Sequence, residues 1–184
     1  MKYILSILIV MVLTFISMFM FTINMNKDKS IKLNAKLSSV MIIVALPIIS
    51  LVGGTLFLAF KLIETILNLN IKTYDIFLIS IIGVFIIFIC DLISKKIIGE
   101  VVPSIFAKKY KEQELSEEKM LEIINNSRKN FNICTLVIMY LLSLLFYLIV
   151  MKIISVEVSL LFLILISFIN LVSYKIFFRT SIKE

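Results

Sequence analysis

The chain of 184 residues is 61% hydrophobic and only 17% charged, and its mean hydropathy is +1.11. A soluble domain has roughly 45–50% apolar and about 25% charged residues. The composition therefore excludes a water-soluble globule, a disordered chain, a disulfide scaffold and a coiled coil. We expect an all-α integral membrane protein, a polytopic helix bundle that forms a single membrane domain over residues 1–184.

Missing residue types exclude several classes of enzyme. The chain has no His, so it has no Ser-His-Asp triad, no HExxH zinc site and no His-ligated haem. Its four glycines form neither the GxGxxG nor the GxxxxGKS/T phosphate-binding motif. We expect no catalytic residue, no cofactor, no metal and no enzyme activity.

Five uncharged runs are candidates for membrane spans. A helix needs roughly 20 residues to cross the hydrocarbon core, and it satisfies its own backbone hydrogen bonds there. Asp91 interrupts the third run, but Leu92 and Ile93 follow, so we expect that helix to continue past the acid. The first run is longer than a signal-peptide core, and no A-x-A pattern follows it, which indicates a retained helix. The predicted spans are approximately 3–24, 37–60, 74–93, 131–151 and 157–176.

Basic residues predict the orientation. The loops after spans one and three and the C-terminal tail hold 15 of the 19 Lys and Arg residues. Cytoplasmic loops carry the Lys and Arg excess, so we expect the N-terminus outside and the C-terminus inside the plasma membrane. The net charge of +7 then reflects topology and attraction to an anionic inner leaflet, and we expect no nucleic-acid partner.

Spans two to five each carry a stripe of small or polar residues at helical spacing. Small residues let helices approach closely, and hydroxyl groups can bond across helices. Ser50 and Gly54 form a small-xxx-small pair, and Pro47 is expected to kink its helix. Ordinary bundle packing is the favoured interpretation, and a polar pathway is the alternative. The stripes are Ser39, Pro47, Ser50, Gly53 and Gly54; Ser80, Gly83, Asp91 and Ser94; Asn132, Thr135, Ser143 and Tyr147; and Ser159, Ser167, Asn170 and Tyr174.

Asp91 is an acid that can lie inside the inner edge of the membrane. Ionisable residues in a span are functional candidates, and each needs a partner. Lys95 follows four residues later, the favourable order on a helix, and Lys175 and Arg179 end span five on the same side. We favour a structural ion pair at a helix interface over a proton relay or an ion site.

Residues 93–130 form the predicted cytoplasmic helical loop. Its first part has an apolar face flanked by lysines, which is typical of a helix lying in the inner-leaflet interface, and Pro103 is expected to bend or end it. A straight extension of span three that packs on a partner helix is the alternative. In the second part, Ser116 is a predicted N-cap. The apolar face comprises Ile97, Ile98, Val101, Val102, Ile105 and Phe106.

These features favour a non-catalytic protein that acts through a membrane-protein partner or a second copy of itself. It would be an accessory or regulatory subunit or an immunity-type factor. The alternative is a small transport or channel component. Pro47, Asp91 and the stripes of hydroxyl residues support this alternative. Cys90 and Cys134 fall near cytoplasmic span ends, so we expect free thiols rather than a disulfide.

The predicted orientation can be tested with single cysteines. Asn70→Cys is expected to react with a membrane-impermeant maleimide from outside intact cells, and Ser116→Cys only after the membrane is opened. Asn70 follows span two and Ser116 lies in the highly basic third loop. The reverse labelling pattern would contradict the charge argument.

Overall fold

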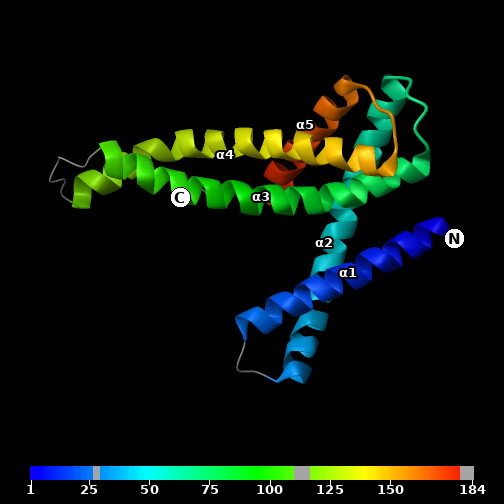
Figure 1. The fold of residues 1–184 in the computed structure, drawn as a ribbon, viewed down its shortest axis with the longest axis horizontal. Coiled ribbons are helices and arrows are strands. Elements are labelled where there is room, and N and C mark those ends of the chain that lie inside the picture. The colour runs from blue at the N-terminus through cyan, green and yellow to red at the C-terminus, as the bar shows by residue number, and fades with distance from the viewer. Residues whose placement is uncertain (27–29, 110–116, 179–184) are drawn as a thin grey trace.

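The structure is a computed structural model, and it describes residues 1–26, 30–109 and 117–178, with the side chains of residues 102–130 left out of the description. Within these ranges the secondary structure is helical (Figure 1). The helices are α1 (Lys2–Met25), α2 (Ile31–Ile66), α3 (Thr73–Lys109), α4 (Glu117–Ile154) and α5 (Leu160–Phe177).

Each helix contains a segment long and apolar enough to cross a membrane, which confirms an all-helical, multi-pass membrane protein with five spans. The α3 helix passes through Asp91 without a break, as expected. The α2 helix is longer at both ends than the predicted span 37–60. That prediction stopped at charged residues, whereas Lys36 and Lys61 are good helix formers. The segments are Lys2–Met25, Ile31–Ile66, Thr73–Val101, Phe131–Ile154 and Leu160–Phe177.

Serine side chains cap the N-termini of two of the helices. Ser30 Oγ accepts a hydrogen bond from Leu33 N at 3.4 Å and caps α2, and Ser159 Oγ accepts one from Phe162 N at 3.2 Å and caps α5. Such a cap satisfies one of the free N–H groups of the first turn. The Ser159 cap places the start of α5 at Leu160, slightly later than the predicted span start at 157.

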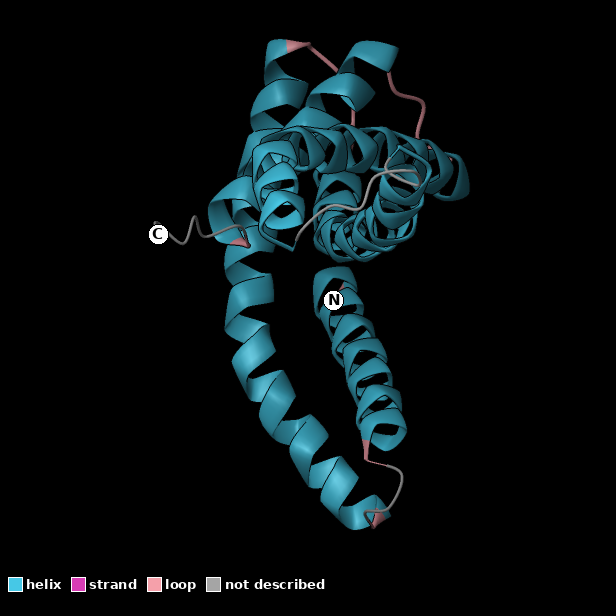
Figure 2. Ribbon diagram, turned by 90° about the vertical axis from the view of Figure 1, so that its left-hand side faces the viewer, coloured by secondary structure: helices cyan, strands magenta, loops and turns pink. Residues whose placement is uncertain are grey.

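Pro47 lies inside α2, which continues on both sides of it. Proline has no N–H and crowds the preceding turn, so it bends helices. Figure 2 shows α2 curved along its length rather than interrupted. The expected kink is therefore a curvature within one continuous helix.

The segment between spans three and four differs from the expected interfacial helix. α3 continues through Pro103 to Lys109, and α4 is a single helix from Glu117 to Ile154. Their ends lie side by side, away from the other helices (Figure 1). A helix that prolongs the axis of a membrane span fits the straight extension, which was the alternative prediction, better than the interfacial placement. α4 begins directly after Ser116, and the predicted cap itself lies outside the described residues.

The buried core lies between α3, α4, α5 and the C-terminal half of α2. α2 crosses the antiparallel α3–α4 pair steeply in both Figure 1 and Figure 2, and α5 packs against α2, α3 and α4. Fully buried members include Val52, Leu56, Phe60, Ile79, Val84, Ile87, Tyr147, Phe162 and Ile166.

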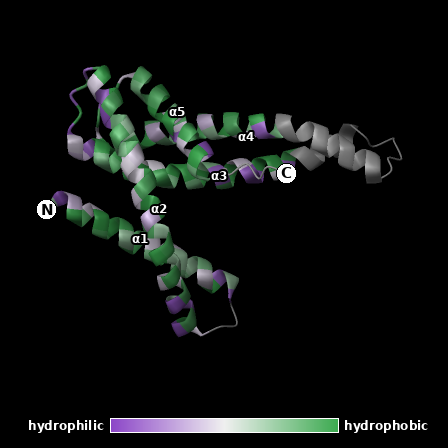
Figure 3. Ribbon diagram, turned by 180° about the vertical axis from the view of Figure 1, so that it is seen from behind, coloured by the Kyte–Doolittle hydropathy of each residue, from purple (hydrophilic) through white to green (hydrophobic). Residues whose placement is uncertain are grey.

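α1 stands apart from this core. None of the buried apolar side chains of the described residues comes from α1, whose buried side chains are Ser6, Thr14 and Thr22. Thr22 Oγ1 and Ser38 Oγ of α2 share a hydrogen bond of 2.8 Å. α1 and the N-terminal half of α2 form a hairpin that extends from the core (Figure 2) and is apolar over most of its surface (Figure 3). A few polar contacts and many exposed apolar residues therefore characterise this arm.

Among the glycines, Gly83 has the least space for a side chain, because other helices pack directly against it. A Cβ added there would lie 2.5 Å from Tyr147 Oη and 3.2 Å from Leu56 Cδ1, whereas a Cβ on Gly54 would have nothing within 4 Å. We expect Gly83→Ala to lower the free energy of unfolding by about 1–3 kcal/mol, the usual cost of overpacking, in thermal unfolding in detergent. Gly54→Ala is the matched control, and an equal loss in both variants would contradict the packing.

Candidate functional site

Asp91 joins α3 to α5 at the predicted cytoplasmic ends of these helices. Its Oδ2 accepts a hydrogen bond from Lys95 Nζ at 2.6 Å, and its Oδ1 accepts one from Tyr174 Oη at 2.6 Å. The Asp91 side chain is 17% exposed and that of Lys95 is 64% exposed. The ion pair thus faces outward along one helix, and the tyrosine bond crosses to the next helix.

The cluster holds a carboxylate with both oxygens engaged. A hydrogen bond to an ionised acceptor is stronger than one between neutral groups, and an exposed i, i+4 pair contributes little. The contact that crosses between helices is therefore the more important one, and Tyr174 fixes α5 against α3.

A second polar group lies where α3, α4 and α5 meet. Asn170 Nδ2 of α5 donates to the carbonyl oxygen of Gly83 at 3.4 Å and to Ser143 Oγ of α4 at 3.3 Å. Tyr147 of α4 is fully buried beside Gly83, and its ring packs edge to face on Phe60 at 6.0 Å. Three of the predicted stripes therefore converge in the buried interior.

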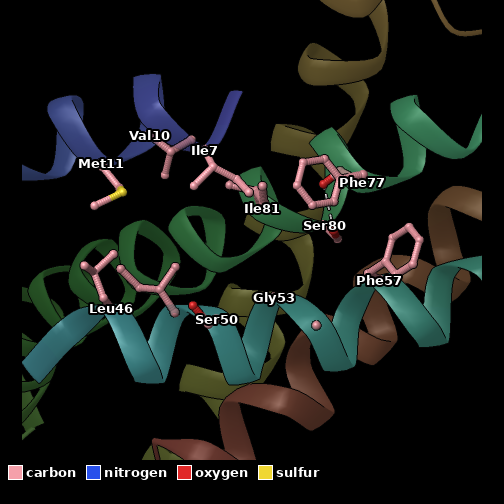
Figure 4. A pocket seen from close by; sticks show the side chains of 12 residues that line it. Ile7, Val10, Met11, Leu46, Ser50, Gly53, Phe57, Phe77, Ser80 and Ile81 are labelled. Carbon is pink, nitrogen blue, oxygen red and sulfur yellow. Dashed lines mark hydrogen bonds between the residues drawn. The ribbon is translucent and has the colours of Figure 1, made fainter. Parts of the chain in front are cut away.

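A cavity of about 340 Å³ opens between α1, α2 and α3. Figure 4 shows side chains of α1 on one side, α2 on the other and α3 closing one end. Nearly all of its surface is apolar, and the nearby Ser80 hydroxyl donates to its own helix, at Phe77 O. The cavity exists because α1 diverges from the core. Its lining is Ile7, Val10, Met11, Leu46, Ile49, Ser50, Gly53, Gly54, Phe57, Phe77, Ser80 and Ile81.

The small residues of α2 divide between two faces. Gly53 is buried, and a Cβ there would lie 3.6 Å from Val84 Cγ2 of α3. Ser50 and Gly54 are exposed and border the cavity. A Cβ on Gly54 would meet nothing within 4 Å, so among the two adjacent glycines it is Gly53 that packs against α3. Pro47 is exposed on the same helix.

The apolar residues predicted for an interfacial helix are only partly described. Ile97 and Val101 are exposed on α3, and Ile98 is half-buried. Val102, Ile105 and Phe106 belong to α3, but their side chains are outside the description. The exposed pair leaves an apolar surface on the extension of α3.

Sequence reasoning missed two features of the site. It placed Lys175 and Arg179 of span five near Asp91, but the α5 residue that bonds Asp91, beside the predicted Lys95, is Tyr174; Arg179 lies outside the described residues. The polar stripe of span five contained Tyr174, so helical register was the available signal. It also overlooked Glu64, which is buried at the end of α2 and accepts a hydrogen bond from Lys61 Nζ at 2.7 Å.

Within the part of the chain that the structure describes, no three Cys, Asp or Glu side chains gather to hold a metal ion. Cys90 is buried and Cys134 is exposed, and both are free thiols. No protein-family model, curated protein or solved structure matches this chain.

The Asp91 cluster predicts unequal effects of its two partners. Tyr174→Phe removes a hydrogen bond between helices and is expected to lower the free energy of unfolding by about 1–2 kcal/mol. Lys95→Met removes only the exposed ion pair and is expected to cost about 0.3–0.5 kcal/mol. Thermal unfolding in one detergent compares the two, and a larger loss for Lys95→Met would contradict the assignment.

Proposed function

We propose that this multi-pass membrane protein is non-catalytic and acts by binding another membrane protein, as an accessory or regulatory subunit or an immunity-type factor. The observation that carries the proposal is the cavity between α1, α2 and α3, with exposed Ser50 and Gly54 on its α2 wall.

A partner's transmembrane helix that packs on α2 and places side chains in the cavity is the occupant that this geometry favours. Ser50 and Gly54 lie one turn apart on α2, and a Cβ on Gly54 would meet nothing within 4 Å. Small residues at this spacing allow two helix backbones to approach closely. A lipid chain fits any apolar groove and does not require small residues, whereas a helix packing on α2 does.

The proposed setting is the plasma membrane, with the N-terminus outside and the C-terminus inside. The support is the concentration of Lys and Arg in the loops after spans one and three and in the tail. In this orientation, the extensions of α3 and α4 project towards the cytoplasm, and the basic residues face the anionic inner leaflet.

A small transport or channel component is the second candidate. The observation that favours it is the buried polar group of Asn170, Ser143 and Tyr147, with the Asp91 cluster further along α3. The hydrogen bonding of Asp91 argues against transport, because both carboxylate oxygens are engaged by side chains of the same protein and are not free to bind an ion.

Site-specific crosslinking in the native membrane tests the proposed helix contact. In a Cys134→Ser background, a photoreactive maleimide on Gly54→Cys is expected to yield one discrete adduct. The same label on Ile48→Cys is expected to yield none, because Ile48 is 46% exposed, does not line the cavity and lies on the opposite side of α2 from Ser50 and Gly54 by helical spacing. The captured protein should also co-purify with the unaltered chain and be lost with Gly54→Leu.

Other results would contradict this assignment. A product of twice the chain mass would identify a second copy as the occupant, and adducts with lipid alone would overturn the proposal. Liposomes containing the pure protein that exchange ions, and lose this exchange with Asp91→Asn, would favour the transport function.

A further inference from the structure

Polar and aromatic contacts join α1 to α3 at the N-terminal end of α1. Ser6 Oγ and Tyr74 Oη share a hydrogen bond of 2.7 Å. The ring of Tyr3 packs edge to face on the ring of Tyr74 at 5.2 Å and on that of Phe77 at 5.1 Å. Among the described residues, the hydrogen bonds and ring contacts between these two helices all come from Tyr3 or Ser6. The rest of α1 packs along α2.

The donor in the bond between the two helices is the tyrosine. Ser6 Oγ also donates to Lys2 O of its own helix, at 3.0 Å. A serine hydroxyl carries a single hydrogen, so the hydrogen between Ser6 and Tyr74 belongs to the tyrosine. Tyr74→Phe therefore removes this bond and keeps the ring that packs on Tyr3.

The part of α2 around Pro47 is not fixed by packing. Between Ser38 and Val52, no side chain of α2 is buried. Pro47 has no N–H, so α2 lacks one backbone hydrogen bond in this stretch, and helices bend at such a point. The direction in which the N-terminal half of α2 leaves the core therefore depends on contacts elsewhere.

α1 connects the two sides of this bend. Its C-terminal end is bonded to α2 before the proline, where Thr22 Oγ1 and Ser38 Oγ lie 2.8 Å apart. Its N-terminal end is bonded to α3, as described above. α3 in turn packs on α2 beyond the proline, where the rings of Phe57 and Phe77 lie 6.2 Å apart. The bend of α2 is thus bridged by α1, which is held at both of its ends.

The contact at the N-terminal end of α1 also borders the cavity between α1, α2 and α3. Phe57 and Phe77 lie at the same end of this cavity (Figure 4). Ile7, which follows Ser6 directly, lines it from α1. Apolar attraction between helices has little force in lipid, so the hydrogen bond and the ring contacts are the main attachment of α1 to α3. Loss of this attachment would widen the cavity.

We propose that Tyr3, Ser6, Tyr74 and Phe77 form a latch that holds the arm of α1 and the N-terminal half of α2 against the core. Release of the latch lets the arm swing about Pro47 as one body and opens the cavity. The latch controls the width of the cavity whether a partner helix or lipid occupies it, so it does not depend on the proposed function.

Distances between spin labels in liposomes test the latch. In a Cys134→Ser background, one label pair joins the arm to the core, with Leu8→Cys on α1 and Ile153→Cys on α4, which are 53% and 76% exposed. We expect a single distance that gains a second, longer component in Tyr74→Phe and more of it in Tyr3→Leu/Tyr74→Phe. Thr14→Val is the matched control, because Thr14 Oγ1 bonds only within its own helix, to Val10 O, and no change is expected.

A second label pair lies within the arm, with Leu13→Cys on α1 and Leu33→Cys on α2. Its distance is expected to stay the same in Tyr74→Phe, because α1 and the N-terminal half of α2 move together. Pro47→Ala restores the backbone hydrogen bond of α2, and we expect it to reduce the longer component in the Tyr74→Phe variant. An unchanged distance between arm and core in both latch variants would overturn the proposal. So would a changed distance within the arm, which would mean that α1 separates from α2, or a longer component that Pro47→Ala leaves unaltered.

Discussion

In hydrocarbon a polar group must find its partner inside the protein, and the helices of this chain are arranged around that constraint. Many hydroxyl groups solve it within one helix: Thr14 Oγ1 donates to Val10 O at 2.7 Å and Thr135 Oγ1 to Phe131 O at 2.8 Å. Asp91 finds one partner, Lys95, on its own helix, whereas its second oxygen and the Asn170 amide are bonded from other helices. Their needs draw α3, α4 and α5 together, with Tyr174 on Asp91 and Asn170 on Gly83 and Ser143.

α1 has no buried carboxylate or amide that needs a partner on another helix, so little holds it against the core. Its buried hydroxyls are small and all bond to their own backbone, and the hydrogen bonds to other helices run from Ser6 to Tyr74 and from Thr22 to Asn34 and Ser38. Apolar attraction between helices has little force in lipid, where hydrocarbon competes equally well. The divergence opens the cavity beside Ser50 and Gly54, and the proposed partner helix would fill what α1 leaves uncovered.

The two polar sites and the cavity fit different kinds of role. Both carboxylate oxygens of Asp91 are engaged by side chains of the same protein, and the Asn170 amide nitrogen bonds α3 and α4, which suits a rigid core. The cavity is open and apolar, with small residues exposed on α2. A rigid core that presents one open helix contact is the arrangement expected of a binding subunit, and this is why we place interaction before transport.

Sequence alone determined the helical class, the five spans, the passage of α3 through Asp91 and the Asp91–Lys95 pair, because hydrophobic run length and i, i+4 spacing are local properties. It predicted the stripes of small and polar residues but not which stripes would meet. Tertiary packing decided that Tyr174 reaches Asp91, that Gly53 rather than Gly54 contacts α3, and that α3 continues through Pro103 beside α4. These outcomes depend on the rotation and crossing of helices far apart in the chain, and residue spacing within one helix shows which residues share a face but not which other helix that face meets.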